Sequence, residues 1–533
     1  MTLLRHLLTA TALLGASAKA AQGVTGTPFG FASGTTGGGD ATPAAPSDIS
    51  ELTSWLSDST PRVILIDKEF NFLDSEGKCT DCECCIPSSN TCGSSGQNAV
   101  KQNGSDWCGS YPATTCTYDN AAIEGLEVAS NKSIVGVGSS GVLRGKGLRL
   151  VNGVSNIIIQ NIHITELNPQ YIWGGDAITL DGTNNVWIDH VKINLIGRQM
   201  FVAGYEASHH VTISNSEFDG QTSWSATCNG HHYWTVLGYG HNDQVTFANN
   251  YLHHTSGRSP KLEFNSFWHA YNNYWYNNTG HAFDVGENTR ALIEGNVMVD
   301  VNTPLLADSN PGAVFAVNSS DVSSCTKILG RTCVPNTLVS SGTLSGSNSS
   351  VVSSWPSGES DITVMAASKV ASYVLANAGI GKLGNGSGSS STVAAVATSA
   401  VAKRAGPEDD ALFGGAPFVP AFSQAGPGAS AVPSQPSWSW RKVSTDVAAP
   451  TGTPSEGSSQ GLGAPAPQAT GGKHHHHKGH HGHGSQVNLF PSKLGPPSSE
   501  SHNEPDCRIL MTAKGAELQP HALTVKAIVY EGD

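Results

Sequence analysis

Residues 156–164 read NIIIQNIHI, and the same nine-residue pattern returns five times before Asp300. The later copies are NVWIDHVKI (185–193), HVTISNSEF (210–218), QVTFANNYL (244–252), FWHAYNNYW (267–275) and RALIEGNVM (290–298). Apolar residues alternate in each copy, as in a half-buried strand, and a polar turn residue follows. The turn residues are Asn161, His190, Asn215, Asn249, Asn272 and Gly295, which lie 29, 25, 34, 23 and 23 residues apart.

This spacing predicts a solenoid whose coils share one core and differ in loop length. One copy alone would equally suit a sandwich or a barrel, but no Asn-Gly or Asp-Gly pair joins two copies as a tight hairpin. Strands that repeat in one direction with longer connections favour parallel coils. We therefore expect an all-β chain, a single-stranded right-handed parallel β-helix with a short N-terminal helix and a disordered C-terminal tail.

The composition divides the chain into three parts. Residues 1–20 have the charged start, short apolar run and small-residue end of a signal peptide. Residues 21–385 are the predicted β-helix domain. Within it we expect a helix over 47–56, capped by Ser47, and a partly helical segment over 361–378 that ends at Gly379.

Residues 386–533 are rich in Ser, Gly, Pro and Ala and contain few large apolar residues. Such a segment cannot bury enough surface to fold, so we expect a disordered tail. Its His-rich tract over 473–484 could bind a divalent metal weakly, but a solvated low-complexity run is the preferred interpretation.

The eleven cysteines also indicate secretion. Five of them lie between Cys79 and Cys92, with no histidine nearby to complete a metal knuckle. Export favours disulfides over thiolate ligands, so a secreted, extracellular glycoprotein is expected. Six glycosylation sequons, at Asn103, Asn131, Asn277, Asn318, Asn348 and Asn385, agree with this compartment.

The net negative charge of the predicted domain argues against polyanionic partners. Residues 21–385 contain 31 Asp and Glu against 17 Lys and Arg. Such a domain should not bind nucleic acid and should repel a bare polyanion at long range. No stretch after the signal peptide is apolar enough to suggest a membrane span, and a monomer is expected.

Cations are scarce in the middle of this acidic domain. Between Ile193 and Thr289 the only Lys and Arg residues are Arg198, Arg258 and Lys261. Each could simply pair with a nearby carboxylate on the surface. However, they occupy equivalent turns of the predicted coils, and coils stack about 5 Å apart. We therefore expect the three cations to converge with Asp176.

Six motifs that contain these residues resemble one family. YIWGGDAITL (171–180), NVWIDHV (185–191), IGRQ (196–199), SATCNGHHYW (225–234), HTSGRSPK (254–261) and GHAFDVGE (280–287) are similar, in order and spacing, to the pectin lyases. These are the fungal-type branch of the polysaccharide lyase family that also holds pectate lyases. The resemblance covers about residues 24–385. It implies a right-handed parallel β-helix and cleavage of methyl-esterified galacturonan by β-elimination.

The resemblance also implies residue roles. Arg258 would abstract the C5 proton, which is α to the C6 carbonyl. A guanidinium normally stays protonated, so only burial beside other cations would make neutral Arg258 accessible. Arg198 and Lys261 would supply that repulsion and stabilise the oxyanion, and Asp176 would orient or partly offset these charges.

No metal or cofactor is expected. The related pectate lyases bind Ca²⁺ through several carboxylates, whereas this chain has Arg198 in the corresponding loop and Asp176 as the one carboxylate there. Trp173, Tyr233 and Trp234 flank the motifs and could stack on sugar rings, or could simply pack in the core.

Three disulfides are expected. Local spacing and the family pattern both pair Cys325 with Cys333. By looser resemblance, Cys228 pairs with Cys92, and Cys108 with one of the cysteines between Cys79 and Cys85. The dense cysteine cluster and the tail depart from the family pattern.

Three other functions would each account for part of the sequence pattern. A Ca²⁺-dependent pectate lyase would have the same fold but would require chelatable calcium. A glycoside hydrolase would need convergent carboxylates, and Asp176 stands alone among cations. A non-catalytic wall-binding protein would use the aromatic residues for sugar, but it would not need the four polar residues.

Overall fold

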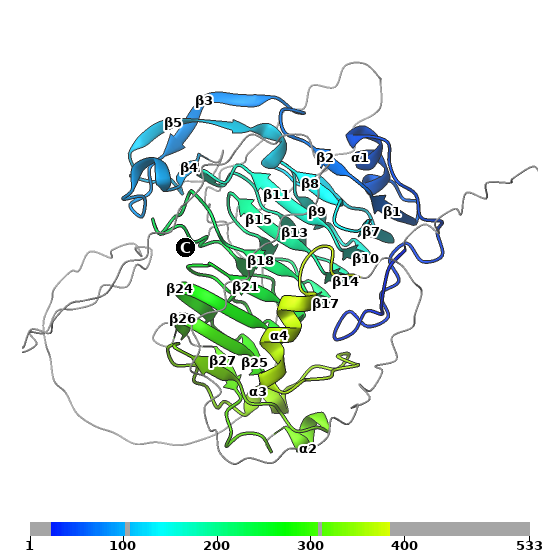
Figure 1. Ribbon diagram of the computed structural model, residues 1–533, viewed down its shortest axis with the longest axis vertical. Coiled ribbons are helices and arrows are strands. Elements are labelled where there is room, and N and C mark those ends of the chain that lie inside the picture. Colours follow the sequence, from blue (N-terminus) through cyan, green and yellow to red (C-terminus); the bar gives the residue numbers. More distant parts are fainter. Residues whose placement is uncertain (1–22, 102–106, 307–311, 324, 384–533) are drawn as a thin grey trace, which may run out of the picture. The chain divides into compact units, whose positions relative to one another are not determined.

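The computed structural model describes residues 23–101, 107–306, 312–323 and 325–383 (Figure 1). The predicted signal peptide and the predicted tail lie outside these ranges. Within them, no helix has the length and apolar character needed to cross a membrane.

The six copies of the sequence pattern form six consecutive strands of one parallel sheet. This first face consists of β1 (Arg62–Ile66), β7 (Lys132–Gly136), β10 (Ser155–Gln160), β14 (Asn184–Asp189), β17 (His209–Ser214), β20 (Gln244–Ala248), β23 (Phe267–Tyr271), β25 (Arg290–Glu294) and β27 (Ala313–Ala316). The six strands that carry the copies pair in sequence order, each parallel to the one before. The predicted parallel β-helix is confirmed.

Two further faces complete each coil. The second face contains β2 (Glu69–Asn71), β8 (Val142–Arg144), β11 (His163–Leu167), β15 (Lys192–Ile196), β18 (Glu217–Asp219), β21 (Tyr251–His253), β24 (Tyr274–Val285), β26 (Val297–Leu305) and β28 (Thr337–Val339). The third face contains β6 (Leu126–Glu127), β9 (Leu148–Val151), β13 (Ile178–Asp181), β16 (Phe201–Ala203), β19 (Val236–Gly238) and β22 (Lys261–Leu262). The long strand β24 turns from one face to the other, because its start pairs with β21 and its end with β22.

The corner between the first and second faces has a constant length. Two residues separate the two strands in each of the six coils from β10/β11 to β25/β26. The first of these two residues is the turn residue of the sequence pattern. It adopts a left-handed backbone in every coil, at φ 59° for Asn161, 53° for His190, 45° for Asn215, 60° for Asn249, 53° for Asn272 and 60° for Gly295. Asn and Gly tolerate this conformation best, which explains their recurrence here.

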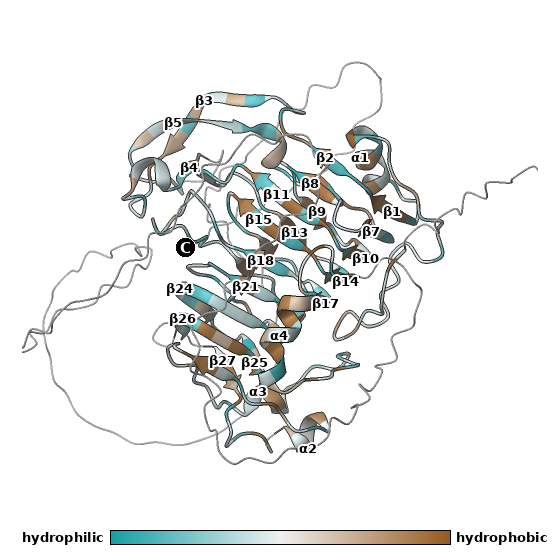
Figure 2. Cartoon of the chain, viewed as in Figure 1, coloured by the Kyte–Doolittle hydropathy of each residue, from teal (hydrophilic) through white to brown (hydrophobic). Residues whose placement is uncertain are grey.

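One continuous apolar core runs along the solenoid. Hydrophobic and hydrophilic residues are interspersed along the strands that surround it (Figure 2). Helix α1 (Ile49–Ser57) adds Leu52 and Leu56 to this core. The predicted cap of α1 was wrong by one residue: Asp48 accepts the backbone N–H groups of Ser50 and Glu51. A carboxylate oxygen at position 48 reaches these two donors, and the hydroxyl of Ser47 donates to Glu51 instead.

The C-terminal segment wraps back along the coils. It includes α2 (Thr326–Leu329), α3 (Ser350–Ser353) and α4 (Ala367–Asn377), and α4 packs on β24 and β26 through an apolar cluster with Val370 and Val374. A buried ionic network also holds this segment: His269 contacts Glu294 at 2.9 Å and Glu359 at 2.8 Å. Arg331 completes the network through Glu294.

An insert, residues 78–119, interrupts the solenoid early in the chain. Strands β3 (Lys78–Cys85), β4 (Asn98–Val100), β5 (Ala113–Asp119) and β12 (Tyr171–Ile172) form a separate four-stranded sheet, which contains antiparallel pairs. Two short 3₁₀ helices, η1 (Gly93–Ser95) and η2 (Asn120–Ala122), belong to the same region. In Figure 1 the β3–β5 ribbon arches beside the coils of β11 and β15. Because β12 belongs to the motif of Trp173, the insert lies next to the candidate site.

Candidate active site

The predicted polar residues lie where the chain enters the third face. Asp176 precedes β13, Arg198 precedes β16 and Arg258 precedes β22. Strand register stacks these coils, since Ile178 pairs with Phe201 and Phe201 with Val236. One coil lies between those of Arg198 and Arg258, so their backbones are about two strand spacings apart, roughly 10 Å.

Arg198 and Asp176 form a two-point ion pair. The Nε and Nη2 atoms of Arg198 donate to the two carboxylate oxygens of Asp176 at 3.1 and 3.0 Å. The backbone N–H of Gln199 donates to the same carboxylate at 2.8 Å. The guanidinium carbon of Arg198 also lies 3.7 Å from the ring centroid of Trp173. The cation is therefore fixed in place by a carboxylate on one side and an indole on the other.

This pairing does not fit a calcium site. Both oxygens of Asp176 already accept hydrogen bonds from a guanidinium, so a fixed cation takes the place that a metal would need. Among the described residues, the one group of three side chains that could hold a metal ion is Glu217, Asp219 and His253. Lys192 lies within that group, 2.8 Å from Glu217 and 3.1 Å from Asp219, and already offsets one of its two negative charges.

Arg258 is buried against aromatic rings of the intervening coil. Its guanidinium carbon lies 4.8 Å from the ring centroid of Trp234 and 5.8 Å from that of Tyr233. The residue has only 7% of its surface exposed and a left-handed backbone at φ 46°. Gly257 is required beside it, because a Cβ there would meet the ring of Tyr233 at 2.4 Å.

Lys261 is surrounded by carboxylates. Its Nζ lies 3.4 Å from Glu263 and 3.8 Å from Asp284. Burial raises the pKa of Glu263, and the charge of Lys261 opposes that shift. By resemblance, Lys261 was expected to repel Arg258 and to stabilise the oxyanion. The two acidic side chains beside it offset part of its positive charge. Asp284 lies in the motif GHAFDVGE (280–287), but neither carboxylate had been assigned a role.

The insert supplies an aromatic wall that the sequence analysis missed. Trp107 contacts Trp173 edge to face, with ring centroids 6.3 Å apart, and Tyr111 at 5.9 Å. Trp107, Tyr111, Trp173 and Trp234 all pack around Cys85 and Ile172. Trp173 and Trp234 are thus half-buried wall residues rather than parts of the main solenoid core. In the sequence, the only sign of this wall was the pair of aromatic residues close to Cys108, Trp107 and Tyr111.

Two buried polar side chains hold the backbone of this site. Gln97 donates to the carbonyl oxygen of Gly197 and accepts from the indole N–H of Trp234, at 2.9 and 3.0 Å. His232 Nε2 donates to the carbonyl oxygens of Arg198 and Trp234. Burial lowers the pKa of His232 to about 4, so the ring is neutral near pH 7. Gln97 comes from the insert, and no motif marked it in the sequence.

The described part of the chain contains five disulfides, and they include the pairs expected from the sequence. The bonds join Cys79–Cys82, Cys84–Cys116, Cys85–Cys108, Cys92–Cys228 and Cys325–Cys333. The sequence had left the partner of Cys108 open within the cluster, and the structure gives Cys85. The pairs Cys79–Cys82 and Cys84–Cys116 had not been predicted. Cys507 lies outside the described residues.

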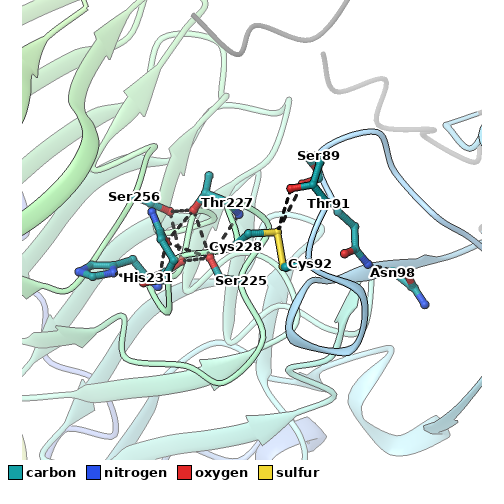
Figure 3. Close-up of a disulfide and its surroundings, with 11 residues drawn as sticks. Ser89, Thr91, Cys92, Asn98, Ser225, Thr227, Cys228, His231 and Ser256 are labelled. Carbon is teal, nitrogen blue, oxygen red and sulfur yellow. Dashed lines mark hydrogen bonds between the residues drawn. A yellow bond between two sulfur atoms is a disulfide. The ribbon is translucent and has the colours of Figure 1, made fainter. Parts of the chain in front are cut away.

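The Cys92–Cys228 bond ties the insert to the loop that leads into Tyr233 and Trp234 (Figure 3). On the other side of that loop, Thr227 Oγ1 donates to Ser256 Oγ at 2.8 Å. Ser256 lies two residues before Arg258. A chain of contacts therefore links the insert, the aromatic loop and the turn that carries Arg258.

The chain belongs to the pectate lyase family, whose family model matches residues 1–383. Its relatives include the protein named "Probable pectin lyase F" of Aspergillus niger, 86% identical over 482 residues, which cover 90% of this chain and 99% of that protein. The protein of the same name from Aspergillus flavus is 70% identical over 400 residues, covering 75% of this chain and 93% of that protein. A solved pectate lyase from Paenibacillus sp. 0602 matches with a TM-score of 0.46 and 16% identity, covering 67% of this chain and 96% of that one.

Proposed function

We propose that this protein is a pectin lyase, which cleaves methyl-esterified galacturonan within the chain by β-elimination and leaves 4,5-unsaturated oligosaccharides. The observation that carries the proposal is the two-point ion pair of Arg198 with Asp176, beside a second buried guanidinium at Arg258. The family and the relatives named pectin lyase support the reaction class.

Arg258 is proposed to be the base. It takes the proton from C5, the electron pair forms the C4–C5 double bond, and the C4–O bond breaks. The leaving oxygen then receives a proton. Arg258 is buried over Trp234, so bulk water has little access to the guanidinium. As the proposed base, Arg258 accepts the C5 proton as a neutral guanidine.

Arg198 is proposed to stabilise the negative charge that develops on the carbonyl oxygen at C6. Its orientation is fixed before the substrate binds, because Asp176 and Trp173 hold two sides of the guanidinium. Preorganised charge of this kind needs no rearrangement during the reaction. Lys261 adds positive charge more weakly, since Glu263 and Asp284 lie beside it.

The esterified form of the polymer suits this site better than the free acid. The carboxylate of Asp176 is paired with Arg198, so the charge of Arg198 is already partly balanced. Residues 21–385 as a whole carry 31 acidic and 17 basic side chains. A polyanion would be repelled by such a domain, whereas a neutral methyl ester would not. The half-buried aromatic wall of Trp107, Trp173 and Trp234 lies beside both guanidinium groups, and it is proposed to contact sugar rings there. We further propose that the protein acts as a secreted monomer, in keeping with its five disulfides.

The test is an elimination assay on highly methylated pectin with a chelator present. We expect an unsaturated, ultraviolet-absorbing product at a rate that the chelator leaves unchanged. De-esterified polygalacturonate, with and without added Ca²⁺, is the matched substrate. Activity that requires Ca²⁺ and prefers the de-esterified polymer would instead establish a pectate lyase. Binding without any product would establish a wall-binding protein.

A further inference from the structure

We propose that His281 is a positioning residue for the proposed base: its neutral imidazole holds the backbone of Arg258 in the conformation that the reaction needs. The inference rests on the proposed function of Arg258. It assigns a role to a side chain outside the set Asp176, Arg198, Arg258 and Lys261, and it predicts an acid-sensitive contact in the site.

The contact itself determines the protonation state of the ring. The backbone N–H of Arg258 donates to Nε2 of His281 at 3.1 Å. A backbone N–H can only donate, so Nε2 must be the unprotonated nitrogen and Nδ1 must carry the proton. An imidazolium has no free lone pair and cannot make this hydrogen bond. The contact therefore exists only while His281 is neutral.

Arg258 needs such a contact because its backbone conformation is unfavourable. For a non-glycine residue, the left-handed backbone at φ 46° is less favourable than a right-handed one. A Cβ at Gly257 would meet the ring of Tyr233 at 2.4 Å, so the turn before Arg258 lies close to that ring. A hydrogen bond to the Arg258 amide offsets part of the strain and fixes the start of its side chain.

Strand β24 is shaped to present His281 to this amide. The pairing of β24 with β26 shifts register between Asn278 and His281, at the point where the strand turns toward the third face. A Cβ at Gly280 would lie 1.8 Å from the carbonyl oxygen of Ser256, so glycine allows the strand to approach the turn closely. Bulges often aim a side chain in this way.

Burial and two neighbouring cations favour the neutral ring of His281, against the charge of one carboxylate. Arg258 and Lys261 face it with positive charge, Asp284 on the same strand opposes them, and the ring of Tyr233 lies edge-on at 5.9 Å. Burial is the largest cause that lowers the pKa of His281, to about 4. The ring is therefore an acceptor at neutral and mildly acidic pH, and it loses that role as the pH falls toward 4.

The test compares three substitutions. Glutamine can place its Oε1 near the position of Nε2 and accepts a hydrogen bond without titrating. Asparagine is too short, and leucine has no acceptor. We expect His281→Gln to keep kcat within about threefold of the wild type, and His281→Asn and His281→Leu to lose about 10- to 100-fold in kcat with little change in KM. His163→Gln is the matched control, because the His163 ring bonds Asn194 on the second face.

Two further readouts separate this inference from the proposed function. Hydrogen exchange of the Arg258 amide should be slow in the wild type and in His281→Gln, and faster in His281→Leu, whether or not the protein cleaves pectin. The ratio of wild-type to His281→Gln activity should be constant above about pH 5 and fall toward pH 4, since pH effects common to both proteins cancel in it. An unprotected amide in the wild type, full kcat in folded His281→Leu, or a flat ratio would overturn the role of His281.

Discussion

The guanidinium of Arg258 lies over the indole of Trp234, with its carbon 4.8 Å from the ring centroid. A planar cation suits such a face, and its five N–H groups lie in one fixed fork. Lysine would retain the positive charge but would place one nitrogen on a differently shaped stem.

We therefore expect Arg258→Lys to lose most of kcat on methylated pectin, measured as the rate of unsaturated product formation. Arg290→Lys is a control of the same chemistry, because Arg290 lies over Phe267 at 5.2 Å on the first face. It should retain full activity. A folded Arg258→Lys protein with near wild-type turnover would exclude Arg258 as the base.

Arg198→Ala should reduce kcat by one to two orders of magnitude, roughly the effect of removing one oxyanion partner. The substitution also leaves Asp176 without its partner, so the negative charge near the carbonyl increases. We expect Arg198→Ala combined with Asp176→Asn to recover part of the loss. A double variant with lower activity than Arg198→Ala would show that Asp176 has a separate role.

Lys261→Ala should cost no more than Arg198→Ala, because Glu263 and Asp284 already offset the charge of Lys261. Steady-state kinetics of the two variants in the same buffer makes the comparison. A larger loss for Lys261→Ala would mean that Lys261, rather than Arg198, carries the main electrostatic stabilisation.

The buried network of His269 predicts alkaline sensitivity. Burial alone would lower the pKa of His269, but Glu359 and Glu294 outweigh it and raise the pKa to about 9. The unfolded value is about 6.5. The protonated ring therefore contributes stability in full below about pH 6.5, and this contribution is lost as the pH rises through 9. His269→Gln should lower Tm at pH 6 and flatten the fall in Tm between pH 6.5 and 9, measured by thermal unfolding. A variant with the wild-type slope would show that other groups cause the alkaline loss.

Removal of the Cys92–Cys228 bond should lower stability by about 2–5 kcal/mol, because it closes a loop with a sequence separation of 136. The paired substitution of both cysteines by alanine is compared with that of Cys79 and Cys82, whose separation is only 3. The second variant should unfold at nearly the wild-type denaturant midpoint. Equal losses would contradict an explanation based on loop closure.

The disorder of the tail, residues 386–533, remains a prediction that rests on composition alone. A chain that ends at residue 385 should keep the Tm and the activity of the full chain, because the predicted tail lacks a core. A large drop in Tm on truncation would show that the segment docks on the solenoid.

The fold was predictable from local pattern, since each coil repeats the same physical requirement. Apolar alternation marked the first-face strands, and the residues at the left-handed corner were mostly Asn, with His190 and Gly295 as the exceptions. The pair of Asp176 and Arg198 followed from motif order. By contrast, the carboxylates beside Lys261 and the acceptor at His281 depend on the register between neighbouring coils. The aromatic wall depends on an insert with antiparallel strands, whose approach to the coils no periodicity encodes.

The two-residue corner between the first and second faces determines where the coils of this solenoid can differ in length. Because its length is the same in all six coils, the difference between a 23-residue and a 34-residue repeat must be absorbed at the other two corners. One corner of every coil is thus fixed, and the variation in repeat length lies at the corners that lead into and out of the third face. The polar residues of the candidate site lie where the chain enters that face. Loops of different length can therefore be carried beside the site while the first corner keeps its two residues.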